Sequence, residues 1–147
     1  MTTLIIFLAK YLVAVPVLLV LYVWYRTPDR RAFVYTAIIV GALSFVLSLV
    51  AAALYDNPRP FMLTGVPPLV AHAPGNGFPS DHALLTGTLA AIVTISSPYY
   101  GVIMWLLAVL VGAGRVLAHV HHTIDVIAAF GIAIISAVLV YYTKPGK

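Results

Sequence analysis

Five long apolar runs dominate this chain of 147 residues. Hydrophobic residues make up 63% of the sequence and charged residues only 8%, too few to cover an apolar core with a charged surface. A membrane-spanning helix needs about 20 apolar residues, which is close to the length of each run. We therefore expect an all-α, polytopic membrane helix bundle of about five transmembrane helices, folded as one domain over residues 1–147.

The apolar runs also predict where the helices begin and end. The expected spans cover residues 2–25, 32–55, 80–97, 99–120 and 123–143. Pro16 lies inside the first run, which predicts a kink or a local loosening of that helix. Because apolar residues precede Lys10 and the run continues to Tyr25, a retained helix fits this segment better than a cleaved signal peptide.

The basic residues predict how the chain is oriented in the membrane. They cluster between the first two runs and at the C-terminus: Arg26, Arg30, Arg31, Lys144 and Lys147. The positive-inside rule places both clusters in the cytoplasm, and we expect the cell membrane as the location. The long loop 56–79 then lies on the extracytoplasmic side. We expect it to be too proline-rich for a helix and to roof a site in the membrane interface.

Composition excludes several function classes. Eight Lys and Arg residues against four Asp residues give a net charge of +4, which is too little for a nucleic-acid-binding face. The absence of cysteine excludes disulfides, thiolate nucleophiles and Cys-ligated zinc. Apart from Lys10, the ionisable residues outside the cytoplasmic clusters map to the extracytoplasmic side. Charges are costly near hydrocarbon, so this gathering predicts a functional site.

Three clusters on that side carry the chemistry: Asn57-Pro58-Arg59-Pro60, Pro79-Ser80-Asp81-His82 and Arg115-x5-His121-x3-Asp125. In order and spacing they resemble the motifs of the type 2 phosphatidic acid phosphatase superfamily, which includes bacterial polyprenyl diphosphate phosphatases and vanadium haloperoxidases. The family pattern is Lys-x6-Arg-Pro, then Pro-Ser-Gly-His, then Ser-Arg-x5-His-x3-Asp. The resemblance covers roughly residues 52–130 and implies the helical core of that family.

The resemblance assigns roles to residues of this chain. It implies that His121 attacks phosphorus and forms a phosphohistidine, and that His82 serves as general acid and then as base. A helical i to i+4 spacing puts Asp125 on the same face as His121, so its carboxylate can orient the imidazole. The groups expected to bind phosphate are Arg59, Arg115, Ser80 and the helix start at Asp81.

The chain departs from the family pattern at three positions. Ala52 stands at the place of the motif lysine, Asp81 replaces glycine, and Gly114 replaces the serine before the motif arginine. Asp81 must therefore point away from the phosphate, pair with an arginine or help to hold an ion. Lys10 either snorkels toward the site and replaces the lost cation, or simply snorkels to the interface.

These features predict an enzyme that needs no cofactor and acts on a lipid phosphate among membrane lipids. An undecaprenyl-like diphosphate is the first expectation, with phosphatidylglycerophosphate or phosphatidic acid as the alternative. A competing interpretation is metal-dependent hydrolysis or metal transport, with ligands among Asp81, His82, His119, His121, His122 and Asp125. A third is a non-catalytic, lipid-binding relative, which the changes at Ala52 and Asp81 would favour.

Overall fold

A computed structural model of the chain describes residues 1–143, and its regular elements in that range are all helices. In chain order they are α1 (Thr2–Ile6), the π-helix η1 (Phe7–Tyr11), α2 (Ala14–Arg26), α3 (Arg30–Leu54), α4 (Pro60–Thr64), α5 (Asp81–Ser96), α6 (Pro98–Leu117) and α7 (Thr123–Thr143). Lys144 and Lys147, expected in the cytoplasm, lie outside the described residues. The all-helical class is confirmed.

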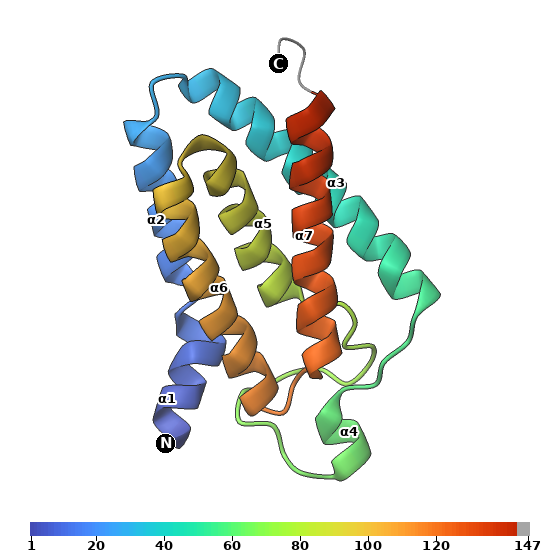
Figure 1. The fold of residues 1–147 in the computed structure, drawn as a ribbon. Helices are drawn as coiled ribbons and strands as arrows, with labels where there is room; N and C mark the ends of the chain where they lie inside the picture. The colour runs from blue at the N-terminus through green and yellow to red at the C-terminus, as the bar shows by residue number, and fades with distance from the viewer. Residues whose placement is uncertain (144–147) are drawn as a thin grey trace.

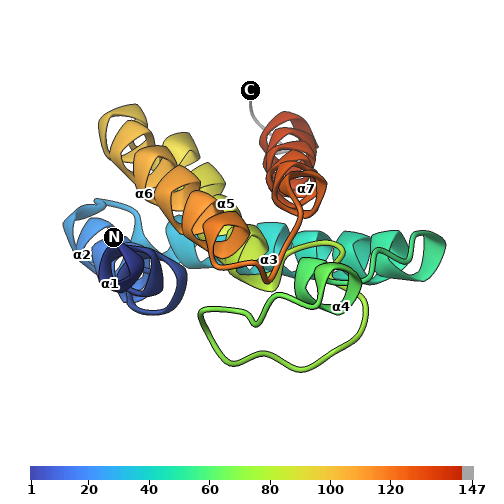
Figure 2. The ribbon, with the colours of Figure 1, turned by 90° about the horizontal axis from the view of Figure 1, so that it is seen from below.

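Helix α5 lies at the centre of the bundle and contacts α2, α3, α6 and α7. Figure 2 shows α5 close to α6, with α7 on the other side and α3 crossing behind them. Buried residues lie around most of the circumference of α5 when its whole length is taken, because Thr88 and Ile92 are buried as well as the face of Ala83 and Gly87. The start of α5 is therefore held by several neighbours at once.

The expected count of five membrane spans is not confirmed. Three helices within residues 1–143 are long and apolar enough to cross a membrane, namely α3, α6 and α7. The bent pair Thr2–Tyr11 and Ala14–Arg26 adds a fourth if it is taken as one span. The expected span at 80–97 corresponds to α5, whose 16 residues cover about 24 Å, less than the roughly 30 Å of the hydrocarbon core.

The predicted loosening of the first helix lies one turn before Pro16. The two halves meet at Leu12 and Val13 with a bend of 42°. Since Pro16 has no N–H to offer the Leu12 carbonyl, Val15 N donates to that oxygen instead, at 3.0 Å. The missing N–H of Pro16 therefore accounts for the π-helix before the bend and for the tighter turn after it.

The long loop contains one short helix, which corrects the expectation that its prolines exclude any. Pro60 stands at the first position of α4, where a missing N–H breaks no helical bond, and Gly65 ends the helix with a left-handed φ of 70°. Helix α6 ends at Leu117, earlier than expected, and His119 turns the chain with a φ of 60°. In Figure 1, α4, the loop and the α6–α7 turn gather at the same end of the bundle as the N-terminus.

The close approach of α5 and α6 generates a stability prediction at Gly101. A Cβ atom at this position would lie 2.8 Å from the Cα of Thr94, and a backbone atom cannot move aside cheaply. We expect Gly101→Ala to lower the free energy of unfolding by about 1–3 kcal/mol, measured by thermal denaturation in detergent. The control is Gly131→Ala, where nothing lies within 4 Å and no loss is expected. Equal stability of the two variants would contradict this packing.

Candidate active site

The centre of the site is the imidazole of His121, which is 1% exposed. Its Nδ1 lies 2.9 Å from the carbonyl oxygen of Gly77 and 3.4 Å from Oδ2 of Asp125. Both oxygens only accept, so Nδ1 carries the proton. On the other side, Nη1 of Arg59 donates to Nε2 at 3.2 Å. These contacts fix the tautomer, with Nε2 unprotonated and its lone pair accepting from Arg59, so Nε2 becomes a nucleophile once Arg59 moves to another acceptor.

Asp125 is fully buried and holds the loops of the site together. Its Oδ1 accepts from Nδ2 of Asn57 at 2.7 Å, and its Oδ2 accepts from the backbone N–H of His122 at 2.8 Å. Its backbone carbonyl accepts from Ser80 N at 3.1 Å. Asp125 thus contacts His121, although His121 lies in the turn before α7 and does not share a helical face with it, and Asp125 also links the starts of α5 and α7.

Two asparagines complete this framework, and the sequence analysis gave neither a role. Asn57 begins the cluster that contains Arg59, and this position in the sequence was the one feature that could have indicated a role for it. Asn76 accepts from the N–H groups of Asn57 and Phe78 at 3.0 and 2.8 Å. Its Nδ2 donates to the carbonyls of Ala52 and Tyr55 at the end of α3. The loop is therefore tied to α3 on one side and to the His121 pair on the other.

Arg59 and Arg115 lie in the site as predicted, both buried. Nη1 of Arg59 donates to the Val120 carbonyl at 3.0 Å as well as to His121. Burial lowers the pKa of Arg59, and the carboxylates of Asp81 and Asp125 oppose that shift. Nη1 of Arg115 donates to the Ala9 carbonyl at 3.2 Å. Backbone carbonyls therefore hold both guanidinium groups without neutralising their charge.

Three buried donors in the site have no partner: Nε of Arg59, Nε of Arg115 and the hydroxyl of Ser80. Ser80 is the N-cap residue of α5 as predicted, but its side chain makes no capping bond, and its amide already donates to Asp125. Buried polar groups without partners are rare in native structures and need an explanation. An anion with several oxygens would satisfy all three.

The remaining predicted residues lie in the first turn of α5. His82 is half-buried, while Asp81 is exposed and makes no ion pair within residues 1–143. Asp81 faces a cavity that Arg59 also lines. Of the three options for Asp81, residues 1–143 thus show neither pairing with an arginine nor a group of side chains with which it could hold an ion.

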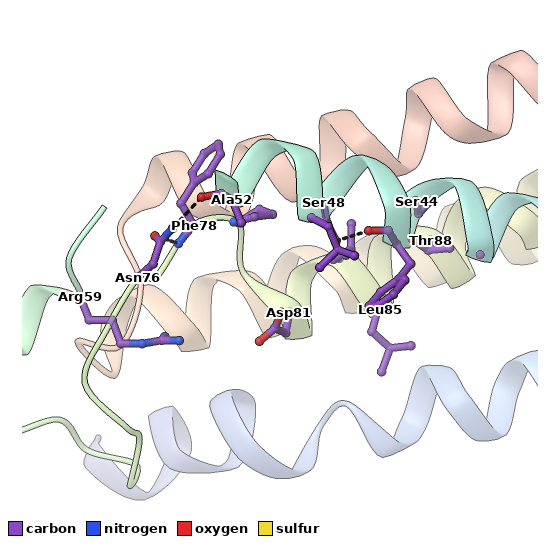
Figure 3. Close-up of a pocket in the computed structure, with 14 residues that line it drawn as sticks. Ser44, Ser48, Ala52, Arg59, Asn76, Phe78, Asp81, Leu85 and Thr88 are labelled. Atoms are coloured by element: carbon purple, nitrogen blue, oxygen red, sulfur yellow. Dashed lines mark hydrogen bonds between the residues drawn. The ribbon is translucent and has the colours of Figure 1, made fainter. Parts of the chain in front are cut away.

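A cavity of about 510 Å³ lies between α3 and α5. Figure 3 shows Arg59 and Asn76 toward one end, Ser44 and Thr88 toward the other, and Asp81 between them. Apolar side chains such as Phe45, Leu49 and Leu85 line the space between the helices, and Ala52 lines it at the position of the missing lysine. Because His121 and Arg115 are not among its lining residues, the cavity adjoins the site through Arg59.

The presence of Gly114 in place of the family's serine has a steric cause. A Cβ at this position would lie 2.7 Å from the backbone nitrogen of Ala9, because η1 packs directly against α6. The end of η1 leaves carbonyls without helical partners, and Ala9 offers one of them to Arg115. Lys10 does not replace the lost cation, since its side chain is exposed and its Nζ lies over the ring of Tyr11, 5.3 Å from the centroid.

The alternative of a metal centre finds no ligand set in residues 1–143. No three histidine or aspartate side chains in that range are grouped so that they could hold an ion. His122 donates through Nε2 to the Pro58 carbonyl at 3.1 Å, and His119 is exposed. These two histidines therefore do not extend the His121–Asp125 pair into a metal site.

The packing of η1 on α6 generates a prediction for anion binding. Gly114→Ser restores the family residue but forces η1 away, so Arg115 loses the Ala9 carbonyl that positions it. We expect the affinity for inorganic phosphate, measured by calorimetry in detergent, to fall about tenfold. Ala113→Ser, which adds the same group at the preceding, exposed position, serves as the control. Unchanged phosphate affinity in Gly114→Ser would contradict the role of η1.

Comparisons with known proteins agree with this geometry. Residues 31–147 match the PAP2 superfamily. The chain is 33% identical over 141 residues to the bacitracin transport permease protein BcrC of Bacillus licheniformis, covering 95% of this chain and 70% of that protein. It is 29% identical over 140 residues to undecaprenyl-diphosphatase BcrC of Bacillus subtilis (strain 168), covering 92% and 71%.

A solved structure also matches. The crystal structure of LpxE from Aquifex aeolicus superposes with a TM-score of 0.71 and 26% identity, covering 94% of this chain and 81% of that one. All seven predicted site residues fall within the family match, whereas α1, η1 and α2 precede it. The chain therefore belongs to the PAP2 superfamily and is a membrane phosphatase.

Proposed function

We propose that this chain hydrolyses a lipid phosphate through a phosphohistidine on His121. The observation that carries the proposal is the set of unpartnered buried donors on Arg59, Arg115 and Ser80, next to a histidine whose unprotonated Nε2 accepts only a hydrogen bond from Arg59. Such donors stabilise the charge on the equatorial oxygens during phosphoryl transfer. On substrate binding, Arg59 would exchange His121 Nε2 for a phosphate oxygen and so release the nucleophile.

The proposed reaction has two steps. Nε2 of His121 forms a bond to phosphorus while the bond to the leaving oxygen breaks, and His82 donates a proton to that oxygen. Water then attacks the phosphohistidine as His82 takes a proton from it. The phosphorus–nitrogen bond breaks, and inorganic phosphate and the original imidazole result.

The first candidate substrate is an undecaprenyl-like diphosphate, hydrolysed to the monophosphate. A relative named undecaprenyl-diphosphatase and the apolar cavity beside Arg59 both support this choice. The leaving group from a diphosphate is a phosphate monoester, which departs more readily than an alkoxide. A site without the motif lysine, as here with Ala52, is therefore better suited to a diphosphate.

One observation favours a glycerolipid phosphate as the second candidate. Ser44 and Thr88 line the same cavity, and their buried hydroxyls have no partner. Thr88 lies about 10 Å along α5 from Asp81, so these hydroxyls would face the lipid rather than the phosphate. An isoprenoid chain offers them no hydrogen bond, whereas the ester oxygens of phosphatidic acid or phosphatidylglycerophosphate would.

We further propose that the site faces away from the cytoplasm, in the cell membrane. Arg26, Arg30 and Arg31 lie at the α2–α3 turn, and Figure 1 shows this turn at the opposite end of the bundle from α4 and the site loop. The positive-inside rule would put that turn in the cytoplasm and the site on the outer face.

Phosphate release by the purified protein in detergent and EDTA tests the substrate. We expect release from a polyprenyl diphosphate to exceed release from phosphatidylglycerophosphate and phosphatidic acid, since the first has the better leaving group. Faster release from the glycerolipids would favour the second candidate. Release only after addition of a divalent metal would contradict the metal-free mechanism, and binding without release under either condition would identify a lipid-binding relative.

Two substitutions test the nucleophile and its orientation. His121→Ala removes the attacking nitrogen, so we expect phosphate release to be abolished. Asp125→Asn leaves the Gly77 carbonyl, 2.9 Å from Nδ1, to hold the tautomer, so we expect a smaller loss of about 100-fold in kcat. Retained thermal stability in detergent separates these losses from unfolding. Near-normal turnover in His121→Ala would refute the mechanism.

A further inference from the structure

His72 lies inside the cationic site although it belongs to none of the three motifs. Its Nε2 is 3.3 Å from Nη2 of Arg115, and its ring meets the His121 ring edge to face, with centroids 5.9 Å apart. Because a guanidinium only donates, His72 Nε2 is the acceptor. His72 thus occupies a position where Arg115 can hold an oxygen atom of an anion.

The loop that carries His72 is anchored on both sides of it. Before it, Leu69 N donates to the Ala118 carbonyl at 3.1 Å, and Val70 is buried against Ala118 and Val120. After it, Gly77 N donates to the Asn57 carbonyl at 2.8 Å. These contacts join the loop to the α6–α7 turn and to the Arg59 segment. The protein therefore places His72 against Arg115.

The charges around His72 depend on whether an anion is present. The ionisable groups that act on its ring are Arg59, Arg115, His121 and His82. Burial first, and then the positive charge of Arg59 and Arg115, lowers the pKa of His72 to about 4, so the ring is neutral in the empty site. A phosphate dianion between the two arginines reverses this field and favours the protonated imidazole.

We propose that His72 is an additional phosphate-binding residue. This proposal rests on the proposed function only for the identity of the anion. When phosphate arrives, Arg115 exchanges the His72 nitrogen for a phosphate oxygen. His72 then takes up a proton from solvent and donates a hydrogen bond to the same phosphate. His72 thereby supplies a positive charge that the site lacks because Ala52 replaces the motif lysine. The charge comes from the loop between α4 and α5 and not from α3.

Inorganic phosphate is the probe that tests this inference. Its dissociation constant is measured by calorimetry between pH 5.5 and 8 for the wild type, His72→Ala and His72→Lys. Lipid-diphosphate kinetics on the same proteins give KM and kcat. The matched control is His119→Asn, which replaces an exposed histidine of the same face by a residue that tolerates its φ of 60°. Thermal denaturation in detergent checks the fold of each variant.

We expect His72→Ala to weaken phosphate binding about tenfold at pH 6 and to raise KM more than it lowers kcat. Wild-type affinity should fall more steeply with rising pH than that of His72→Ala, because only the wild type takes up a proton at residue 72. His72→Lys, already protonated, should bind tightly with a flatter pH profile. The other ionisable groups of the site and phosphate itself are the same in every variant, so the difference between the profiles belongs to His72.

Two results would overturn the inference. Equal phosphate affinity and equal pH profiles for wild type and His72→Ala would show that His72 does not touch the anion. Tighter binding in His72→Ala would show that His72 only competes for Arg115. If His72→Ala fails to fold, the comparison of the pH profiles of phosphate affinity between His72→Lys and the wild type still tests the inference. A wild type that binds phosphate through His72 but hydrolyses no lipid would refute the proposed function alone.

Discussion

The burial of two guanidinium groups at one end of an apolar bundle is the constraint on which the rest of the site depends. Arg59 and Arg115 are 8% and 3% exposed, and burying a charge is costly unless hydrogen-bond partners compensate it. The chain compensates one Nη1 of each group with the carbonyls of Val120 and Ala9 and not with carboxylates, and it leaves both Nε donors unpartnered. Carboxylate partners would cancel the positive charge, whereas carbonyls leave it to attract an anion.

This constraint explains the shape of the N-terminal segment. A regular helix would use its own carbonyls, but the π-helix and the bend before Pro16 leave the Ala9 carbonyl for Arg115. Gly114 allows the approach, since a side chain there would collide with the Ala9 backbone. Although this segment precedes the family match at residue 31, it completes the environment of an arginine inside that match.

Residue spacing was sufficient to predict the parts of the site that a single helix or motif brings together. The His121–Asp125 contact expected from the i to i+4 spacing is observed at 3.4 Å, but His121 lies in the turn before α7, so the turn and not a shared helical face produces it. The Gly77 carbonyl and His72 were not predictable, because their positions depend on the path of a loop with no periodicity. The central position of α5 was not predictable either, because hydrophobicity alone does not distinguish lipid from protein neighbours.

The departures from the family pattern act in opposite directions on the proposed substrate. Losing the lysine at Ala52 weakens charge stabilisation and favours the better leaving group of a diphosphate. Asp81 adds a negative charge on the cavity wall, where a second phosphate would be repelled. However, Asp81 is exposed, and water and salt reduce the interactions of an exposed charge to about 1 kcal/mol or less. In the proposed reaction the leaving group therefore has the larger influence on the choice of substrate.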